Sequence, residues 1–442
     1  LVTLREFSTL AKVVRHNTDL QSVVLTDIRQ AVTGHVYKKL LARWEAAGAA
    51  DFEPDQPLEA GYHRMDDLLL DAARESPGMA VPHTALATVI YTSGTTDAPK
   101  GVCLTHSNLV ANALQTRHWI PDLRYGEETI LSVVPLLHSY GMTAAMNFPI
   151  LLGATIVLLP VFELEQVLEH IKKYHPTLFP GVPSMYTAIN QAPNVRSYGL
   201  SSIKACISGA APLPIEVQEA FEKLTRGRLV EGYGLTEASP VTHANPLYGV
   251  RKAGSIGIPI PNTDARIVDL ATGEDLPPGQ IGELVVRGPQ VMQGYWSEET
   301  TAAEEPESAL RDGWLFTGDV AVMDADGYFQ IISRKRDTIM AGDYSVYPRD
   351  VEEVLYENNK VMEVAVVGVS TAEKGQRVKA FVVPRPGSHL SKEELLDLCR
   401  RRLEPYAVPW DIEFRSELPK SFVGKVLRRM LVEETAPPPP GD

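Results

Sequence analysis

The chain has 442 residues, of which 44% are hydrophobic and 22% are charged, the balance of a globular protein long enough for two or three domains. Its net charge of −14 argues against a nucleic-acid partner. Cys103, Cys206 and Cys399 lie far apart with no paired spacing, which argues against a zinc site or disulfides and favours the reducing cytoplasm. The longest apolar run, residues 148–162, is interrupted by glycine and proline, so we expect a buried helix end, a turn and a strand, and no transmembrane segment.

Short β-branched runs alternate with helical stretches between Thr88 and Val230. The strand candidates are TVIY, TILSVVP, ATIVLLP, TLFP and IKACIS, and the helix candidates are THSNLVANALQ, ELEQVLEHIKKY and PIEVQEAFEKL. Thr105 is expected to cap the first of these helices. This alternation is typical of an α/β fold with a parallel sheet flanked by helices, on which ligands bind beyond the carboxyl ends of the strands.

The pattern changes after Gly254. Residues 264–288 predict two strands joined by a long turn, so a small β-rich part follows, and residues beyond Ser333 predict a compact α+β unit. The stretch DADG, residues 324–327, is expected to be a hairpin turn and not a calcium loop, because Lys335 stands at the twelfth position, where a calcium loop needs glutamate. Residues 435–442 predict a disordered tail.

The stretch YTSGTTDAPKGV, residues 91–102, predicts a loop that holds an anion. Hydroxyl side chains and backbone N–H groups can surround a phosphate chain, and Lys100 adds a positive charge. The common nucleotide P-loop needs Ser or Thr after its lysine, whereas Gly101 follows here. Taken alone, the stretch also fits an ordinary surface turn.

Further motifs follow this loop in a fixed order. They are EGYGLTEASP, GELVVRGPQVMQGYW, DGWLFTGDVAVMDADGYFQI, SRKRDTIMAGDYSVYPRDVEEVLYE and LPKSFVGKVLRR. Together with the loop they resemble the adenylate-forming superfamily, over a match from about Leu86 to Leu431. PLLHSYGM, TLFPGVPSMY and GYGLTEASPVTHANP are most similar to bacterial long-chain fatty-acid–CoA ligases.

The resemblance implies an acetyl-CoA synthetase-like architecture. It divides the chain into a large N-terminal AMP-binding domain (1–333, with a β-rich part at 254–333), a hinge (334–336) and a small mobile C-terminal domain (337–434). It also implies that a carboxylic acid reacts with ATP to give acyl-AMP, and that the acyl group then moves to the thiol of CoA. Two anions meet in the first step, so ATP with Mg²⁺ and positive side chains must neutralise charge.

The resemblance also assigns the nucleotide site residue by residue. The β- and γ-phosphates would contact Thr92, Ser93, Gly94, Thr95, Thr96 and Lys100. The purine would lie against SGAAP, with Ser208, Gly209, Ala210 and Ala211, and on Tyr233 between Gly232 and Gly234. Thr236 would touch the α-phosphate, Glu237 would hold Mg²⁺, and the ribose would contact Asp319 and Arg334. The other interpretations are a helix-terminal carboxylate for Glu237, a turn aspartate for Asp319 and a solvated linker for SRKR.

Lys425 is the leading catalytic candidate, because a lysine carried on a closing domain can bridge the carboxylate and the phosphoryl oxygen. The alternative is a plain surface lysine. By resemblance, Arg336 is the hinge residue and Gly342 lies beside the thiol channel after the small domain swings. His138 would gate the acyl or thiol path, although a satisfied core histidine fits the residue nearly as well.

Three residues depart from the family pattern: Asp97 in the phosphate loop, Asp343 beside Gly342, and Ser333 before the ribose arginine. A carboxylate near phosphates is repulsive, so we expect Asp97 to weaken ATP binding. About 90 residues precede the loop, fewer than is usual, so we expect either a shortened N-terminal subdomain or a truncated chain. These departures keep two rivals open, an acyl- or aryl-AMP ligase that loads a carrier protein and a nucleotide-binding pseudoenzyme. The sequence also leaves a homodimer open.

Overall fold

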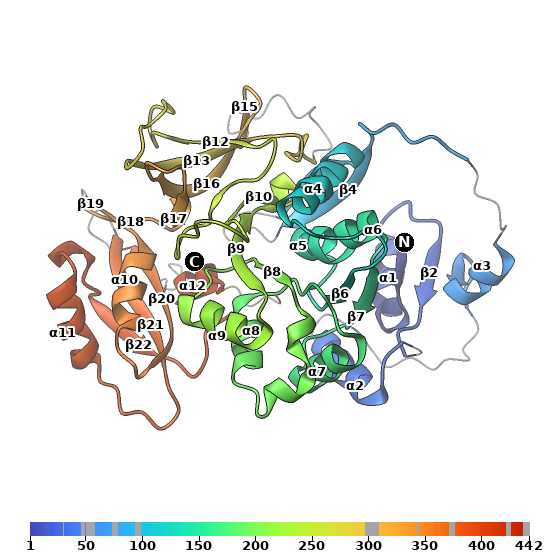
Figure 1. Cartoon of the computed structure of the whole chain (residues 1–442), viewed down its shortest axis with the longest axis horizontal. Coiled ribbons are helices and arrows are strands. Elements are labelled where there is room, and N and C mark those ends of the chain that lie inside the picture. The colour runs from blue at the N-terminus through green and yellow to red at the C-terminus, as the bar shows by residue number, and fades with distance from the viewer. Residues whose placement is uncertain are drawn as a thin grey trace, which may run out of the picture. The chain divides into compact units, whose positions relative to one another are not determined.

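The computed structural model describes residues 1–29, 31–45, 49, 58–72, 78–92, 99–296, 309–342, 344–370, 376–420 and 426–435 (Figure 1). The contacts divide the chain into two compact units, Leu1–Val81 and Pro82–Asp442. The predicted hinge at 334–336 lies inside the second unit and stays a prediction. Among the described residues, no helix combines the length and the apolar character needed to cross a membrane.

The first unit is a small α/β layer. Its three strands are parallel, in the order β1-β2-β3, and its core contains Ala11, Val23, Leu25 and Tyr62. The elements are β1 (Val2–Leu4), η1 (Arg5–Phe7), α1 (Ser8–His16), β2 (Val23–Thr26), α2 (Gly34–Trp44), β3 (Tyr62–Arg64) and α3 (Met65–Asp71).

A parallel sheet lies at the centre of the second unit. Strand β6 (Thr129–Ser132) pairs with β7 (Thr155–Leu158), and β8 (Ala205–Ser208) pairs with β9 (Arg228–Gly234). The predicted strand TLFP is reduced to bridges at Leu178, which join β6 to β8. Strands β10 (Val241–Ala244) and β11 (Ile258–Pro259) continue the sheet in antiparallel fashion.

Alternating strand residues point to two separate cores. Leu131, Cys206 and Leu229 pack with α7 (Leu164–Tyr174), α8 (Pro183–Asn190) and α9 (Ile215–Thr225). Their neighbours Ile130, Ala205 and Val230 pack with α4 (His106–Trp119) and α6 (Phe148–Leu152). A two-residue period with both faces buried is the pattern of a sheet covered by helices on each side, so the predicted fold class is confirmed. The remaining short helices are α5 (Ser139–Met142), the π-helical η3 (Thr143–Asn147), η4 (Val195–Tyr198), η5 (Leu200–Ser202) and η6 (Thr236–Ala238).

Two strands at the start of this unit differ from the prediction. The stretch TVIY belongs to β4 (Leu86–Thr92), which pairs antiparallel with β5 (Lys100–Thr105) and so lies outside the parallel sheet. We did not predict β5, because its residues follow the phosphate loop directly and precede the helix cap. Strand β14 (Gly294–Tyr295) completes this sheet in the order β14-β5-β4.

Helix α4 is anchored by buried polar side chains. Thr105 caps it as predicted, in a reciprocal capping box with Asn108. The Asn108 Nδ2 atom also donates to the carbonyls of Pro289 and Val291, each at 2.8 Å. The helix is thereby tied to the segment that follows β13 (Ile281–Arg287).

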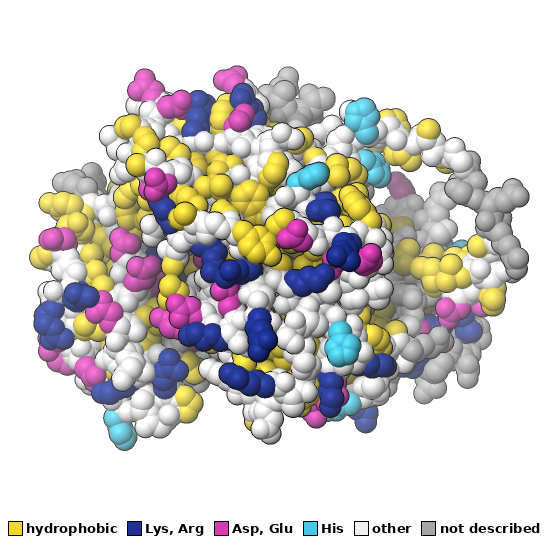
Figure 2. All heavy atoms as spheres, viewed as in Figure 1, with side chains coloured by type: hydrophobic (Ala, Val, Ile, Leu, Met, Phe, Trp, Pro, Cys, Tyr) yellow, Lys and Arg dark blue, Asp and Glu magenta, His cyan; other side chains and the backbone are white. Residues whose placement is uncertain are grey.

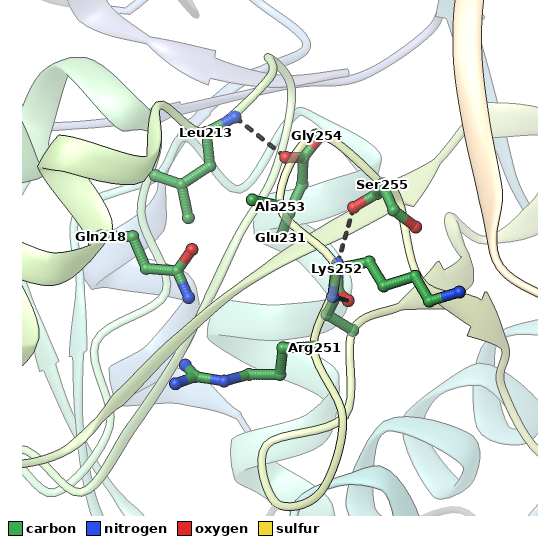
Figure 3. A pocket seen from close by; sticks show the side chains of 9 residues that line it. Leu213, Gln218, Glu231, Arg251, Lys252, Ala253, Gly254 and Ser255 are labelled. Carbon is green, nitrogen blue, oxygen red and sulfur yellow. Dashed lines mark hydrogen bonds between the residues drawn. The ribbon is translucent and has the colours of Figure 1, made fainter.

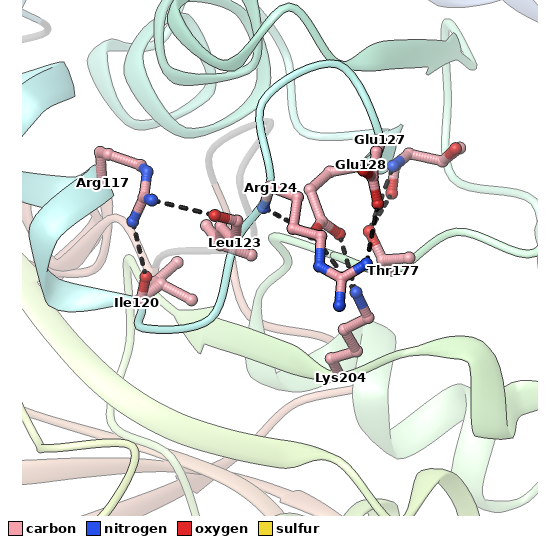
Figure 4. Close-up of polar contacts among 9 residues, drawn as sticks. Arg117, Ile120, Leu123, Arg124, Glu127, Glu128, Thr177 and Lys204 are labelled. Carbon is pink, nitrogen blue, oxygen red and sulfur yellow. Dashed lines mark hydrogen bonds and ion pairs between the residues drawn. The ribbon is translucent and has the colours of Figure 1, made fainter.

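The connection between α4 and β6 is held by a separate polar cluster. The buried Glu128 carboxylate accepts from the Lys204 ammonium at 3.3 Å and from the Arg124 N–H at 3.1 Å (Figure 4). These contacts join the residue before β6 to the residue before β8.

The β-rich part is antiparallel, in the order β12-β13-β16-β15 with β17 beside β16. Its strands are β12 (Asp264–Val268), β13 (Ile281–Arg287), β15 (Leu310–Arg311), β16 (Trp314–Met323) and β17 (Phe329–Arg334). The DADG stretch is the predicted turn between β16 and β17, and its Asp324 and Asp326 carboxylates pair with Lys252. On the face shown in Figure 2, basic and acidic side chains are interspersed.

The C-terminal part is the predicted α+β unit. Strand β21 pairs antiparallel with β20 and parallel with β22, and α10 and α11 pack with this sheet around Val366, Leu355 and Leu395. The elements are η7 (Lys335–Asp337), β18 (Ile339–Ala341), β19 (Tyr344–Val346), α10 (Pro348–Tyr356), β20 (Val361–Ser370), β21 (Gln376–Pro384), α11 (Lys392–Arg402), η8 (Pro405–Ala407), β22 (Asp411–Phe414) and α12 (Arg428–Thr435).

Replacing Asn108 with alanine should destabilise the protein far more than loss of an ordinary helix cap. The substitution removes the buried capping box and leaves two partly buried carbonyls without their donor, so we expect a loss of about 2–4 kcal/mol. The control is Ser391→Ala, which removes the single exposed N-cap bond of α11 at 3.2 Å and should cost about 1 kcal/mol. Urea unfolding measures both, and equal losses would contradict the anchoring role of Asn108.

Candidate active site

A buried carboxylate organises the predicted ribose site. Asp319 on β16 and Arg334 on β17 are register partners, and the Arg334 Nε atom lies 2.8 Å from Asp319 Oδ1. The Tyr233 hydroxyl, from β9, donates to the other carboxylate oxygen. Burial and the adjacent negative charge raise the pKa of Tyr233 well above its usual value, while the Asp319 charge raises the pKa of Arg334. The arrangement therefore holds one anion, one cation and one neutral phenol, and it brings three predicted residues together.

His243 lies behind Tyr233 and was missed by the sequence analysis. Its ring packs edge-on against Tyr233 and Phe329, with centroids 6.0 and 4.8 Å away. Its Nδ1 atom lies 2.9 Å from Thr242 Oγ1, and burial lowers the pKa of His243 to about 3. The imidazole is therefore neutral and supports the tyrosine. No sequence signal marked it, because VTHA does not alternate apolar and polar residues, although all four are buried in β10.

Because His243 takes up a proton readily only when the chain is unfolded, stability should fall as the pH drops below 6.5. With a folded pKa of about 3 and an ordinary value of 6.5, the loss between pH 6.5 and pH 5 is about 2 kcal/mol. His243→Asn keeps a group able to bond Thr242 but does not titrate, so this part of the pH dependence should disappear. The free energy of unfolding at the two pH values checks it. The exposed His389→Asn is the control, and an unchanged slope in His243→Asn would refute the assignment.

The predicted purine loop follows β8. A Cβ atom on Gly209 would lie 3.3 Å from the ring of Tyr140, whose hydroxyl donates to the carbonyls of Gly181 and Ile207. Ala210 adopts a positive φ of 68°, which turns the chain sharply before Ala211. The buried Ser208 hydroxyl has no hydrogen-bond partner within the described ranges. This small-residue loop thus has the close backbone approach that a flat ring needs.

Glu231 connects this loop to the strand that carries Tyr233. Its carboxylate accepts from the Leu213 N–H at 3.1 Å, as Figure 3 shows. Burial raises the pKa of Glu231 to about 7, although the Leu213 N–H and the charge of Arg349 oppose the shift. The residue lies at the edge of a pocket that Arg251 also lines. Nothing in the sequence distinguished Glu231 from a solvent-facing strand residue.

The glycines on either side of Tyr233 are required by packing. A Cβ atom would lie 2.5 Å from Ile207 Cγ2 at Gly232 and 2.1 Å from the carbonyl of Pro240 at Gly234. Such separations are far below van der Waals contact. The strand can therefore approach β8 and β10 this closely only because both positions lack a side chain.

A second group gathers around η6. The Thr236 hydroxyl lies 3.2 Å from the Ser139 hydroxyl at the start of α5. The Glu237 carboxylate accepts from the Tyr295 hydroxyl at 3.0 Å, and the Lys100 ammonium lies 5.2 Å from the centroid of the Tyr295 ring. Thr92 donates to the carbonyl of Lys100 at 3.4 Å, where the two strands of the phosphate hairpin begin to separate. Predicted phosphate and metal residues therefore converge on one tyrosine.

Other predicted residues occupy local structural positions. His138 is the N-cap of α5, and its Nδ1 atom accepts from the Tyr140 N–H at 3.1 Å, while its gating role stays a prediction. Arg336 lies 3.8 Å from Asp337, and Gly342 has a positive φ of 68° in the β18–β19 turn. Several residues with predicted roles or departures from the family pattern lie outside the described ranges. They are Ser93, Gly94, Thr95, Thr96 and Asp97 of the phosphate loop, Asp343, and the catalytic candidate Lys425.

The described ranges contain no cluster of three acidic, histidine or cysteine side chains that could hold a metal ion by itself. A lone half-buried carboxylate such as Glu237 fits Mg²⁺ in a different way. Mg²⁺ keeps several waters and is usually held by one or two carboxylates together with substrate phosphates. The donor set therefore fits an ion that arrives with a nucleotide.

Two family models cover most of the chain. The AMP-binding enzyme family matches residues 10–296, and the AMP-binding enzyme C-terminal domain matches residues 350–425. The chain belongs to the AMP-binding enzyme family. The resemblance to adenylate-forming enzymes is thus confirmed, and the match begins well before Leu86, where the sequence analysis had found no family pattern.

The curated relatives are named as CoA ligases or synthases. A long-chain-fatty-acid–CoA ligase of Bacillus subtilis is 52% identical over 80% of this chain and 62% of its own length. A protein of the same name from Salmonella typhimurium is 37% identical over 96% of this chain and 75% of its own. A feruloyl-CoA synthase from Amycolatopsis is 40% identical over 81% and 72%. The chain thus spans between three-fifths and three-quarters of the relatives it matches.

Solved structures of the same fold include complexes with nucleotide. ATP-bound MatB from Rhodopseudomonas palustris has a TM-score of 0.78 and 28% identity, over 98% of this chain and 88% of that one. The o-succinylbenzoate CoA synthetase MenE from Bacillus subtilis, with ATP and magnesium, has a TM-score of 0.72 and 27% identity over the same shares. Similarity at this level supports ATP binding by members of the fold.

Proposed function

We propose that this protein is an ATP-dependent acyl-CoA synthetase acting through an acyl-AMP intermediate, with a fatty acid as substrate. The observation that carries the proposal is the convergence of Tyr233, Asp319 and Arg334 on one buried network. In η6, three residues after the end of β9, Glu237 contacts Tyr295, whose ring also faces Lys100. An anchored carboxylate with acceptor lone pairs suits a ribose diol, and a lysine with a carboxylate suits a metal-bound phosphate chain.

In the first step, a carboxylate oxygen of the acid attacks the α-phosphorus of ATP, and pyrophosphate leaves. Thr236 would bind the α-phosphate, and Ser93, Gly94, Thr95, Thr96 and Lys100 would bind the phosphates that depart. Mg²⁺ held at Glu237 would neutralise phosphate charge as it develops. In the second step, the thiol of CoA loses its proton, its sulfur attacks the acyl carbonyl, and AMP leaves.

The names of the relatives point to two kinds of acid, fatty acids and ferulic acid. A second candidate substrate is therefore an aromatic carboxylic acid. The feruloyl-CoA synthase is 40% identical, against 52% and 37% for the two fatty-acid ligases. The fatty acid remains the proposal because the long-chain name recurs among the first relatives and the 52% match is the strongest of the three. The cytoplasm is the proposed location, since the three cysteines are free.

One assay separates the candidate functions. The protein is incubated with ATP, Mg²⁺ and a panel of acetate, octanoate, palmitate and ferulate, with and without CoA, and AMP, pyrophosphate and thioester are measured. We expect AMP and acyl-CoA with palmitate or octanoate. Ferulate as the best substrate would support the aryl candidate. Acyl-AMP that accumulates despite CoA would indicate a ligase for a carrier protein, and bound ATP without pyrophosphate would indicate a pseudoenzyme.

Replacing Lys425 with alanine should separate the two half-reactions. By the proposed mechanism the lysine acts only in adenylation, so we expect pyrophosphate formation to fall about 100-fold or more. Thioester formation from added acyl-AMP should change by no more than about threefold. Lys420→Ala, which removes an exposed ion pair with Glu363 in the same segment, is the control. Equal losses in both half-reactions would contradict a role for Lys425 that is confined to adenylation.

A further inference from the structure

The GPQVMQGYW motif, residues 288–296, has no role in the proposed mechanism so far. Its end forms β14, where Gly294 pairs with Cys103 and Tyr295 pairs with Val102 of β5. The Trp296 N–H donates to the carbonyl of Gly101 at 2.6 Å. The segment therefore runs along the strand that leaves the phosphate loop.

The same segment is also bonded to η6 and to helix α4. The Met292 N–H donates to the carbonyl of Glu237 at 2.8 Å, and the Asn108 amide holds the carbonyls of Pro289 and Val291. These bonds fix the segment relative to two parts of the candidate site. One is the hairpin of β4 and β5 that flanks the predicted phosphate loop, and the other is Glu237, the predicted Mg²⁺ ligand. A side chain on this segment can therefore act on both.

Tyr295 contacts both of these groups. Its hydroxyl donates to Glu237 Oε1 at 3.0 Å, and the face of its ring lies 5.2 Å from the Lys100 ammonium. The structure records no ion pair between Lys100 and Glu237 in the part of the chain that it describes. Tyr295 thus contacts both a cation and an anion, two charges that attract each other when they are close.

Separation of these two charges matters for the chemistry. A direct Lys100–Glu237 ion pair would occupy the ammonium needed by the phosphates and the carboxylate needed by a divalent ion. A hydrogen bond from a phenol leaves the other carboxylate oxygen available and restricts its orientation. The quadrupole of the ring attracts the ammonium more weakly than a carboxylate does, so the lysine can be released to an incoming phosphate.

We propose that Tyr295 is a positioning residue: its hydroxyl orients Glu237 toward the divalent ion, and its ring holds Lys100 apart from that carboxylate. This inference rests on the proposed function, because it assigns Tyr295 to the Mg·ATP site of that reaction. Tyr295 acts through Glu237 and Lys100, and it makes no contact with the reacting atoms in this account.

The test is Tyr295→Phe, which removes the hydroxyl and keeps the ring. ATP binding is measured by calorimetry at a series of Mg²⁺ concentrations and in EDTA. Added Mg²⁺ should increase the affinity for ATP, and we expect the Mg²⁺ concentration that gives half of this increase to be about tenfold higher in the variant. A change of this size is usual when a metal ligand loses a hydrogen bond. Binding in EDTA should stay within about twofold, because the ring still holds Lys100. An unchanged Mg²⁺ dependence would overturn the proposal.

Tyr328 provides a matched control elsewhere in the chain. Its hydroxyl donates to the carbonyl of Val250 at 2.7 Å, and the Lys252 ammonium lies 4.7 Å from its ring centroid, so it shares the two kinds of contact that Tyr295 makes. Tyr328→Phe should leave the Mg²⁺ dependence of ATP binding unchanged. A similar rise in both variants would indicate a general loss of stability and would count against a specific role for Tyr295.

A double-mutant cycle covers the possibility of a folding defect. If Tyr295 acts through Glu237, Tyr295→Phe should add no further change in a Glu237→Gln background, whereas independent effects would multiply. Thermal unfolding of each variant identifies loss of fold. Palmitate-dependent exchange of pyrophosphate into ATP is measured alongside. If the wild-type protein binds ATP in a Mg²⁺-dependent way but catalyses no exchange, only the proposed function is refuted. If the Mg²⁺ dependence of ATP binding is unchanged in Tyr295→Phe, only the positioning role is refuted.

Discussion

The buried Asp319 carboxylate is the constraint on which the candidate site depends. An ionised group removed from water is tolerated only with close partners, and here a guanidinium and a phenol supply them. Those partners come from β17 and β9, so neutralising one charge also fastens the β-rich part to the parallel sheet. The ring that would carry a purine and the carboxylate that would carry a ribose are therefore fixed relative to each other before any nucleotide binds.

Other residues of the candidate site are also held in place by their neighbours. Glu231 secures the small-residue loop after β8, and His243 supports Tyr233 from behind as a neutral ring. Tyr295 contacts both Lys100 and Glu237. In each case the residue limits the movement of a neighbour to which the proposed function assigns a direct part in binding or chemistry. Preorganised dipoles and charges of this kind need little rearrangement when charge develops during a reaction.

Local signals in the sequence predicted local features well. The Thr105 cap and the DADG turn were correct because each depends on a few neighbouring residues. The motif order correctly indicated the family, and three of the predicted site residues share one network. Strand β5 was missed because it is short and lies directly between the predicted anion loop and the helix cap, whose motifs include its first and last residues. Tyr295 and His243 were missed because their roles depend on partners distant in sequence, and a strand aromatic or histidine resembles an ordinary core residue.

The pairing of Cys103 with Gly294 has a practical consequence. Cys206 and Cys399 are buried, whereas Cys103 is half-buried, and burial raises the pKa of its thiol. Alkylating reagents attack the thiolate, so in the closed sheet this sulfur should react slowly. Any event that lifts β14 away from β5 would quicken the reaction. The natural chain thus already carries a chemical reporter at the boundary between the phosphate hairpin and the segment that covers it, and no engineered label is needed to follow its opening.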